Sequence, residues 1–158
     1  MKKWFGIILL LAVGLTLFSQ EKKEVSKPMA AGLGLEWNMD ARFNFAGGTS
    51  LSFDYKLPCF FAIGVIATGS TNFNGFNVIE GVVFLRNYVQ RNEHSGFFLQ
   101  IDVGSFIIFE DDDVIPMVEI GARAGFRIPL GSFFYIEPYG RLGVPFAFGL
   151  GVMAGINF

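Results

Sequence analysis

Few side chains in this sequence have the type and spacing needed for catalysis. Hydrolysis of an acyl chain or a peptide normally needs a histidine beside a nucleophile or a carboxylate. The only histidine, His94, lies next to Ser95 in the segment NEHSG. Because polar residues gather in loops, we expect His94 to be a solvated turn residue. The chain is therefore not expected to be an enzyme, and no cofactor is predicted.

Carboxylates offer a second kind of chemistry. Glu119 and Glu137 could act as an acid and base pair, but three arginines follow the same pattern nearby, which favours structural ion pairs. The acidic run EDDD at 110–113 could collect a divalent cation. It lacks the spaced ligands and the glycine of a calcium loop, so a solvated acidic turn is favoured and no metal site is predicted.

Most of the charged side chains obey one rule of position. Along segments in which apolar and polar residues alternate, charges fall at the polar positions and none falls at the apolar ones. Because successive side chains of a strand point to opposite faces, one face of each strand is free of charge. Seven acids and six bases share the polar face, so their charges nearly cancel. They are Glu36, Asp40, Arg42, Asp54, Lys56, Glu80, Arg86, Asp102, Glu119, Arg123, Arg127, Glu137 and Arg141.

This alternation continues almost to the end of the chain and predicts an all-β protein. Some residues break it, namely Ile66, Val82, Phe84, Phe98 and Phe106. A turn is expected at AGGTS (46–50) and loops at 70–77 and 110–115. We count eight strands, at about 30–45, 49–57, 60–69, 78–89, 97–109, 116–128, 133–144 and 148–158.

Two barrel architectures fit these two-faced strands. In a small soluble barrel such as a lipocalin the apolar face fills the interior, whereas in a transmembrane barrel it meets lipid and the polar face lines the lumen. The apolar face here carries bulky Phe, Leu, Ile and Trp, too much volume for the interior of about eight strands. A lysine or arginine facing lipid costs about 2 to 4 kcal/mol, which explains the charge-free face. We predict an eight-stranded antiparallel transmembrane β-barrel over residues 29–158.

The first 19 residues have the layout of a secretory signal peptide. Lys2 and Lys3 precede the apolar run WFGIILLLAVGLTLF, and cleavage is expected after Ser19. A retained membrane anchor is the alternative. Residues 20–28 would then form a short polar periplasmic tail. Cys59 is the only cysteine, so no internal disulfide is expected. It is predicted to be a turn residue, with a reactive thiol as the alternative.

The last strand, GLGVMAGINF at 149–158, ends in an aromatic residue. Together with the signal peptide and the eight alternating strands, it resembles the small outer-membrane β-barrels of the OmpA, OmpX and OmpW type. The resemblance implies that Phe158, with Leu150, Val152 and Ile156, forms the signal read by the outer-membrane assembly machinery. It also implies periplasmic chaperones and outer-membrane lipid as partners, in a diderm bacterium. An even strand number would place both termini in the periplasm.

Three functions are compatible with such a barrel. The many charges expected in a narrow lumen favour a plugged, charge-paired barrel with a structural role in the envelope. The alternatives are an OmpW-like narrow or lateral passage for small apolar solutes, and a surface ligand-binding barrel acting through 70–77 and 110–115. The exterior loops are predicted to be short, which argues against adhesion. The net charge of −2 argues against nucleic-acid binding.

Overall fold

The computed structural model describes residues 27–41, 44–57, 60–73, 75–89, 94–110 and 113–158. The predicted signal peptide, residues 20–26 of the predicted tail, Arg42 and Cys59 lie outside these residues. In the part of the chain so described, no helix is long and apolar enough to cross a membrane.

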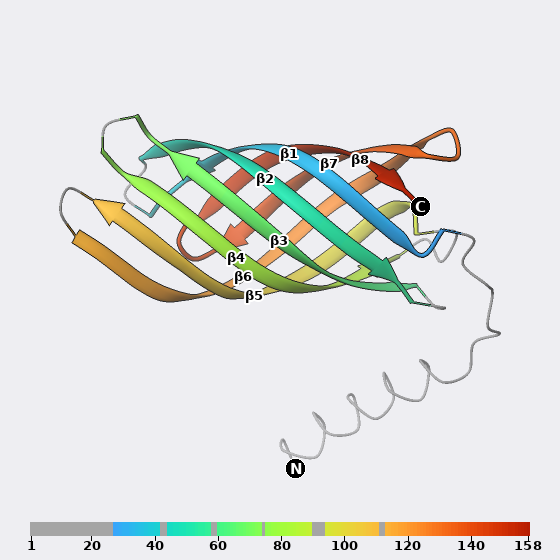
Figure 1. The fold of residues 1–158 in the computed structure, drawn as a ribbon, viewed down its shortest axis with the longest axis horizontal. Coiled ribbons are helices and arrows are strands. Elements are labelled where there is room, and N and C mark those ends of the chain that lie inside the picture. The colour runs from blue at the N-terminus through green and yellow to red at the C-terminus, as the bar shows by residue number, and fades with distance from the viewer. Residues whose placement is uncertain (1–26, 42–43, 58–59, 74, 90–93, 111–112) are drawn as a thin grey trace, which may run out of the picture.

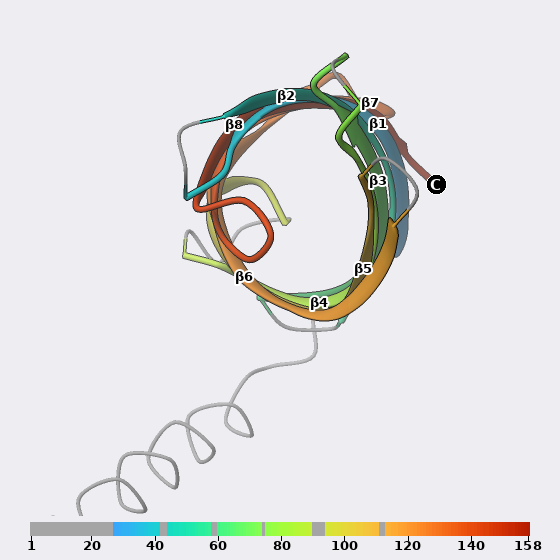
Figure 2. The same ribbon diagram turned by 90° about the vertical axis from the view of Figure 1, so that its left-hand side faces the viewer.

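Eight antiparallel strands close into a single barrel (Figure 1). Each strand pairs with its neighbours in sequence, and β1 also pairs with β8, so the ring has no open edge (Figure 2). The predicted eight-stranded antiparallel barrel is therefore confirmed. The strands are β1 (Met29–Met39), β2 (Phe45–Lys56), β3 (Phe61–Thr71), β4 (Asn77–Tyr88), β5 (Gly96–Glu110), β6 (Asp113–Leu130), β7 (Phe134–Gly143) and β8 (Phe148–Asn157).

The first and last strands close the barrel as neighbours. Met29 N donates to Phe158 O at 3.0 Å, and Phe158 N donates to Met29 O at 2.9 Å. The start of β1 and the carboxy terminus consequently lie at the same end of the barrel (Figure 1). We call this the terminal end and the opposite one the distal end.

The first predicted turn was misplaced. β1 ends at Met39, and AGGTS lies inside β2 instead of forming the turn. The reversal occurs earlier, where the Asp40 carboxylate accepts hydrogen bonds from N and Nδ2 of Asn44, at 2.9 and 3.0 Å. Asp and Asn favour turns because their side chains bond to nearby backbone. Asp40 therefore caps the turn that follows β1.

The hairpin of β5 and β6 is longer than the sequence predicts. Its pairing continues to Glu110 opposite Asp113, so most of the predicted loop at 110–115 is strand. Pairing between β6 and β7 begins only at Gly121, opposite Gly143. Within the described chain, the β6 stretch 113–119 has β5 as its only paired neighbour, and the hairpin extends beyond the wall at the distal end (Figure 1).

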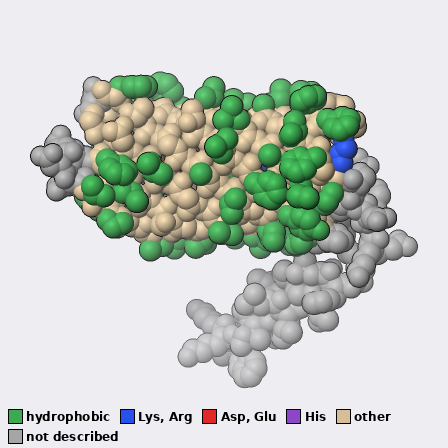
Figure 3. Space-filling view, viewed as in Figure 1, with side chains coloured by type: hydrophobic (Ala, Val, Ile, Leu, Met, Phe, Trp, Pro, Cys, Tyr) green, Lys and Arg blue, Asp and Glu red, His purple; other side chains and the backbone are tan. Residues whose placement is uncertain are grey.

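The two faces of the wall differ as the alternation predicts. Large apolar side chains such as Leu35, Trp37 and Leu51 are more than 60% exposed on the outer face. Figure 3 shows hydrophobic side chains over the visible wall, basic atoms at one end of it and no acidic side chain. The apolar residues that break the alternation face inward, and Ile66, Val82 and Phe84 form a buried cluster.

Glycines on the inner face of β8 make room for tyrosine rings from β7. A Cβ built on Gly151 would lie 2.5 Å from Cζ and 2.7 Å from the hydroxyl oxygen of Tyr139. Gly155 stands in the same relation to Tyr135. The lumen is therefore filled by large side chains set against residues without a side chain.

We expect Gly151→Ala to destabilise the barrel by about 1 to 3 kcal/mol, because the added methyl group would collide with the Tyr139 ring. Gly140→Ala is the matched control, since its Cβ would meet its nearest atoms at 3.7 and 3.8 Å, ordinary contact distances. Urea unfolding of both variants measures the difference. Equal stabilities of the two variants would show that the Tyr139 ring is not packed against Gly151 of β8.

Candidate functional site

The lumen holds two networks of ion pairs, one nearer the terminal end of the barrel and one nearer the distal end. The terminal network consists of Asp54, Arg86, Arg127 and Glu137. The distal network consists of Glu36, Glu80, Asp102, Glu119, Arg123 and Arg141. All ten side chains are buried, and their strands lie around the whole ring except β3 and β8.

In the terminal network, Glu137 lies between two guanidinium groups. Arg86 Nη2 is 2.8 Å from Glu137 Oε1, and Arg127 Nε is 2.6 Å from Glu137 Oε2. Arg127 also reaches across the barrel to Asp54, with Nη2 2.8 Å from Oδ2. Hydrogen bonds between ionised groups are about twice as strong as neutral ones, so these pairs tie β2, β4, β6 and β7 together.

Aromatic rings flank the arginines of this network. The Arg86 guanidinium lies 4.0 Å from the centroid of the Phe98 ring, and that of Arg127 lies 4.2 Å from the centroid of Tyr135. Cations are attracted to the faces of aromatic rings, more strongly where water is excluded. Phe98 interrupts the sequence alternation, and this contact with Arg86 accounts for its inward position.

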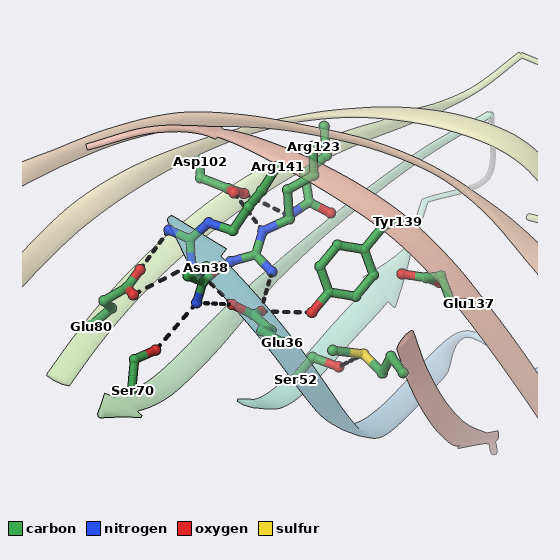
Figure 4. A network of polar contacts seen from close by, with 12 residues as sticks. Glu36, Asn38, Ser52, Ser70, Glu80, Asp102, Arg123, Glu137, Tyr139 and Arg141 are labelled. Carbon is green, nitrogen blue, oxygen red and sulfur yellow. Dashed lines mark hydrogen bonds and ion pairs between the residues drawn. The ribbon is translucent and has the colours of Figure 1, made fainter. Parts of the chain in front are cut away.

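The distal network is centred on Glu36 and Arg141 (Figure 4). Arg123 bridges Asp102 and Glu36, at 2.8 and 2.9 Å. Arg141 contacts three carboxylates, those of Glu36, Glu80 and Glu119, at 3.0, 2.6 and 3.0 Å. The network therefore connects β1, β4, β5, β6 and β7.

The pairing of β6 with β7 has a gap beside the terminal network. Of the described residues in these strands, Phe126 and Arg127 are not joined in the ladder to Glu137 and Pro138, although pairing continues on both sides. Proline has no backbone N–H to donate. The ion pair of Arg127 with Glu137 spans this gap from inside the lumen.

Both ends of the lumen are narrowed by turns. At the distal end the turn between β7 and β8 curls into the ring (Figure 2) and buries Phe146 against Ala46, Val78 and Phe106. At the terminal end His94 is buried, its ring 5.4 Å from that of Tyr88. The prediction of a solvated His94 is therefore wrong, because its imidazole packs against Tyr88 and approaches Phe61 O at 3.2 Å.

The structure brings together most of the charges that the alternation selected. Eleven of the thirteen predicted residues are buried in the lumen, Asp40 lies in a turn, and Arg42 is not described. Among the described residues Lys56 forms no ion pair with either network, and it donates to Asn157 Oδ1 at 2.6 Å. The predicted role of Phe158, Leu150, Val152 and Ile156 in assembly stays a prediction, and all four side chains are exposed on the outside of the barrel.

Sequence reasoning missed the uncharged members of the networks. The Tyr139 hydroxyl donates to Glu36 Oε1 at 2.6 Å, Asn38 Nδ2 donates to Glu36 Oε2 at 3.2 Å, and Gln100 Nε2 donates to Asp102 Oδ1 at 2.5 Å. Each has the polar parity of its strand, and that parity could have identified all three. Among the described residues, no group of three or more His, Cys, Asp or Glu is arranged to hold a metal ion.

No protein-family model and no curated protein sequence matches the chain. Solved structures are similar in fold. Neisserial surface protein A has a TM-score of 0.60 at 10% identity, over 82% of this chain and 96% of that one. The N-terminal β-barrel domain of Pseudomonas aeruginosa OprF has a TM-score of 0.52 at 12% identity, over 82% and 97%. The Yersinia pestis outer membrane protein Ail has a TM-score of 0.53 at 11% identity, over 82% and 99%. The chain thus has the fold of the small outer-membrane barrels, as the resemblance implied.

We expect Arg123→Met to destabilise the barrel by about 3 to 5 kcal/mol, because it leaves the Asp102 carboxylate buried with no guanidinium partner. Adding Asp102→Asn removes that charge and should recover part of the loss. Urea unfolding of the single and double variants provides the comparison. A single variant as stable as the wild type would show that the pair contributes nothing to folding.

Proposed function

We propose that this chain is an integral outer-membrane protein whose charge-paired, closed lumen gives it a mainly structural role in the envelope of a diderm bacterium. The observation that carries the proposal is the separation of charge from apolar surface. In the part of the chain that the structure describes, the strand charges of the two networks lie inside, while large apolar side chains cover the outer wall.

This arrangement is the one that hydrocarbon demands. A sheet is stable in lipid only if it closes, because each backbone N–H and C=O needs a partner within the protein. The ring of β1 to β8 meets that demand. An outer wall rich in exposed Leu, Ile, Val and Phe would be a poor surface in water.

The filled lumen supports a structural role over a passage. Arginine side chains cross the interior at two levels and are fixed by eight ion pairs between described residues. Phe146 and His94 further narrow the two ends. We therefore rank an OmpW-like passage for small apolar solutes below the structural role.

The position of the carboxy terminus supports the proposed assembly signal. Phe158 is 47% exposed on the outer surface, and its ring lies 6.3 Å from that of Phe53 in β2. Leu150, Val152 and Ile156 point outward from the same strand. We propose that these outward side chains of β8 are recognised by the assembly machinery after periplasmic chaperones deliver the chain. We also propose that both termini stay in the periplasm.

The long hairpin of β5 and β6 supports a second function, binding of a ligand at the cell surface. It extends beyond the partner strand β7 and exposes Val114, Met117 and Val118. Deleting 110–115 should leave the barrel folded and abolish binding if this function is correct. Unchanged binding by the shortened barrel would exclude it.

We expect Val152→Lys to prevent stable insertion, because Val152 lies in the middle of β8 on the outer face. A lysine facing the bilayer centre costs about 2 to 4 kcal/mol. Val152→Thr, of similar shape but uncharged, is the control and should insert. Electrophoretic mobility before and after boiling reports the folded fraction. Equal behaviour of the two variants would contradict a lipid-facing β8.

We expect the wild-type barrel to show no reproducible single-channel openings in planar bilayers, since guanidinium groups and Phe146 occupy the lumen. A variant with Arg86→Ala, Arg141→Ala and Phe146→Ala removes side chains at three levels and should conduct. Insertion of both proteins is checked by protease protection. Regular single-channel openings of the wild-type barrel would favour the OmpW-like passage over the structural role.

A further inference from the structure

The distal network is not balanced in charge. Its four carboxylates face only two guanidinium groups, a formal sum of −4 + 2 = −2. All six side chains are buried. An uncompensated charge in a medium of low dielectric constant is costly, so buried charges are normally paired or neutralised.

Three of the four carboxylates accept two or more hydrogen bonds from described residues. Glu80 receives both terminal nitrogens of Arg141, at 3.3 and 2.6 Å. Asp102 accepts hydrogen bonds from Arg123 and Gln100. Glu36 accepts the largest set, from Asn38, Arg123, Tyr139 and Arg141.

Glu119 is the exception. Its Oε1 contacts Arg141 Nη2 at 3.0 Å, while its Oε2 has no hydrogen-bond partner although the residue is 0% exposed. The same Arg141 nitrogen lies closer to Glu80, at 2.6 Å. Glu119 is therefore the carboxylate of this network that is least compensated.

Glu119 shares its arginine partner with another acid. Glu80 Oε2 and Glu119 Oε1 approach the same nitrogen, Arg141 Nη2, at 2.6 and 3.0 Å. Two ionised carboxylates can only accept hydrogen bonds, so they repel at this distance. A single proton changes one of them into a donor and converts the repulsion into a hydrogen bond.

We propose that Glu80 and Glu119 form a proton-binding site in the lumen, in which Glu119 is a neutral carboxylic acid that donates to the Glu80 carboxylate. The proton comes from water during folding and no covalent bond other than O–H is formed. The two networks and Lys56 together hold six acids and five bases. With one proton on Glu119, five negative charges face five positive ones.

Among the described residues, the rest of the wall provides no other charge to take the place of the proton. The charged and titratable groups around the pair are Glu36 from β1, Asp102 from β5, Arg123 from β6, and Tyr139 and Arg141 from β7. From β2, β3 and β8 the described inward residues at this level are uncharged, namely Gly48, Ser50, Thr68, Ser70 and Gly149. A metal ion is not favoured, because no suitable group of ligands is found among the described residues.

Infrared spectroscopy of the folded barrel in lipid at neutral pH tests the site, because a carboxylic acid has a C=O stretch separate from that of a carboxylate. We expect this band in the wild type, shifted in deuterated water, and its complete loss in Glu119→Gln. The glutamine amide can donate to Glu80 as the acid does, so Glu119→Gln should unfold at the same urea concentration as the wild type or a higher one.

Asp54→Asn is the matched control, since it removes an equally buried carboxylate from the terminal network and should keep the band. Absence of the band from the wild type, or its persistence in Glu119→Gln, would overturn the proposal. If the wild type lacks the band, a stoichiometric bound cation found by elemental analysis would identify the charge that neutralises Glu119 instead of a proton. The inference rests on the closed lumen proposed above, but the two fail separately, because conductance tests the lumen and the band tests the proton.

Discussion

Closure of the backbone ladder between β1 and β8 is the constraint on which the rest of the molecule depends. Once the ring is closed, every strand has two neighbours and the side chains divide into an inner and an outer set. The inner set shares a space only wide enough for side chains. Charges placed there are forced within contact distance of one another, so pairing between acids and bases becomes a requirement for folding.

The alternation of apolar and polar residues predicted the strand number and the two unlike faces, and the bulk of the apolar face predicted that the charges lie inside. It did so because a period of two follows from strand geometry and needs no knowledge of distant residues. Individual ion pairs could not be predicted in this way. Arg123 meets Glu36 across 87 positions of sequence, and such a contact depends on barrel diameter and on which rotamers remain after neighbouring rings are packed.

The errors of sequence reasoning lie where local chemistry overrides the pattern. The glycines of AGGTS were interpreted as a turn, yet Gly48 is an inner-face residue whose added Cβ would lie 2.5 Å from the Ser70 hydroxyl. Glycine serves there to leave space. His94 and Phe146 are both buried although they lie between strands, and the composition of such a segment does not distinguish a side chain that points to solvent from one that is buried.

Pro138 gives the ring one place where its continuity depends on side chains. On both sides of this proline the backbones of β6 and β7 are joined directly, over Gly121–Gly125 and Ile128–Leu130, but beside it the strands are connected by the ion pair of Arg127 with Glu137. Lateral pressure in a bilayer acts on all eight seams alike. At this boundary a side-chain ion pair stands where the other described strand pairs have backbone hydrogen bonds, so water entering the interior would weaken the β6–β7 contact at this point.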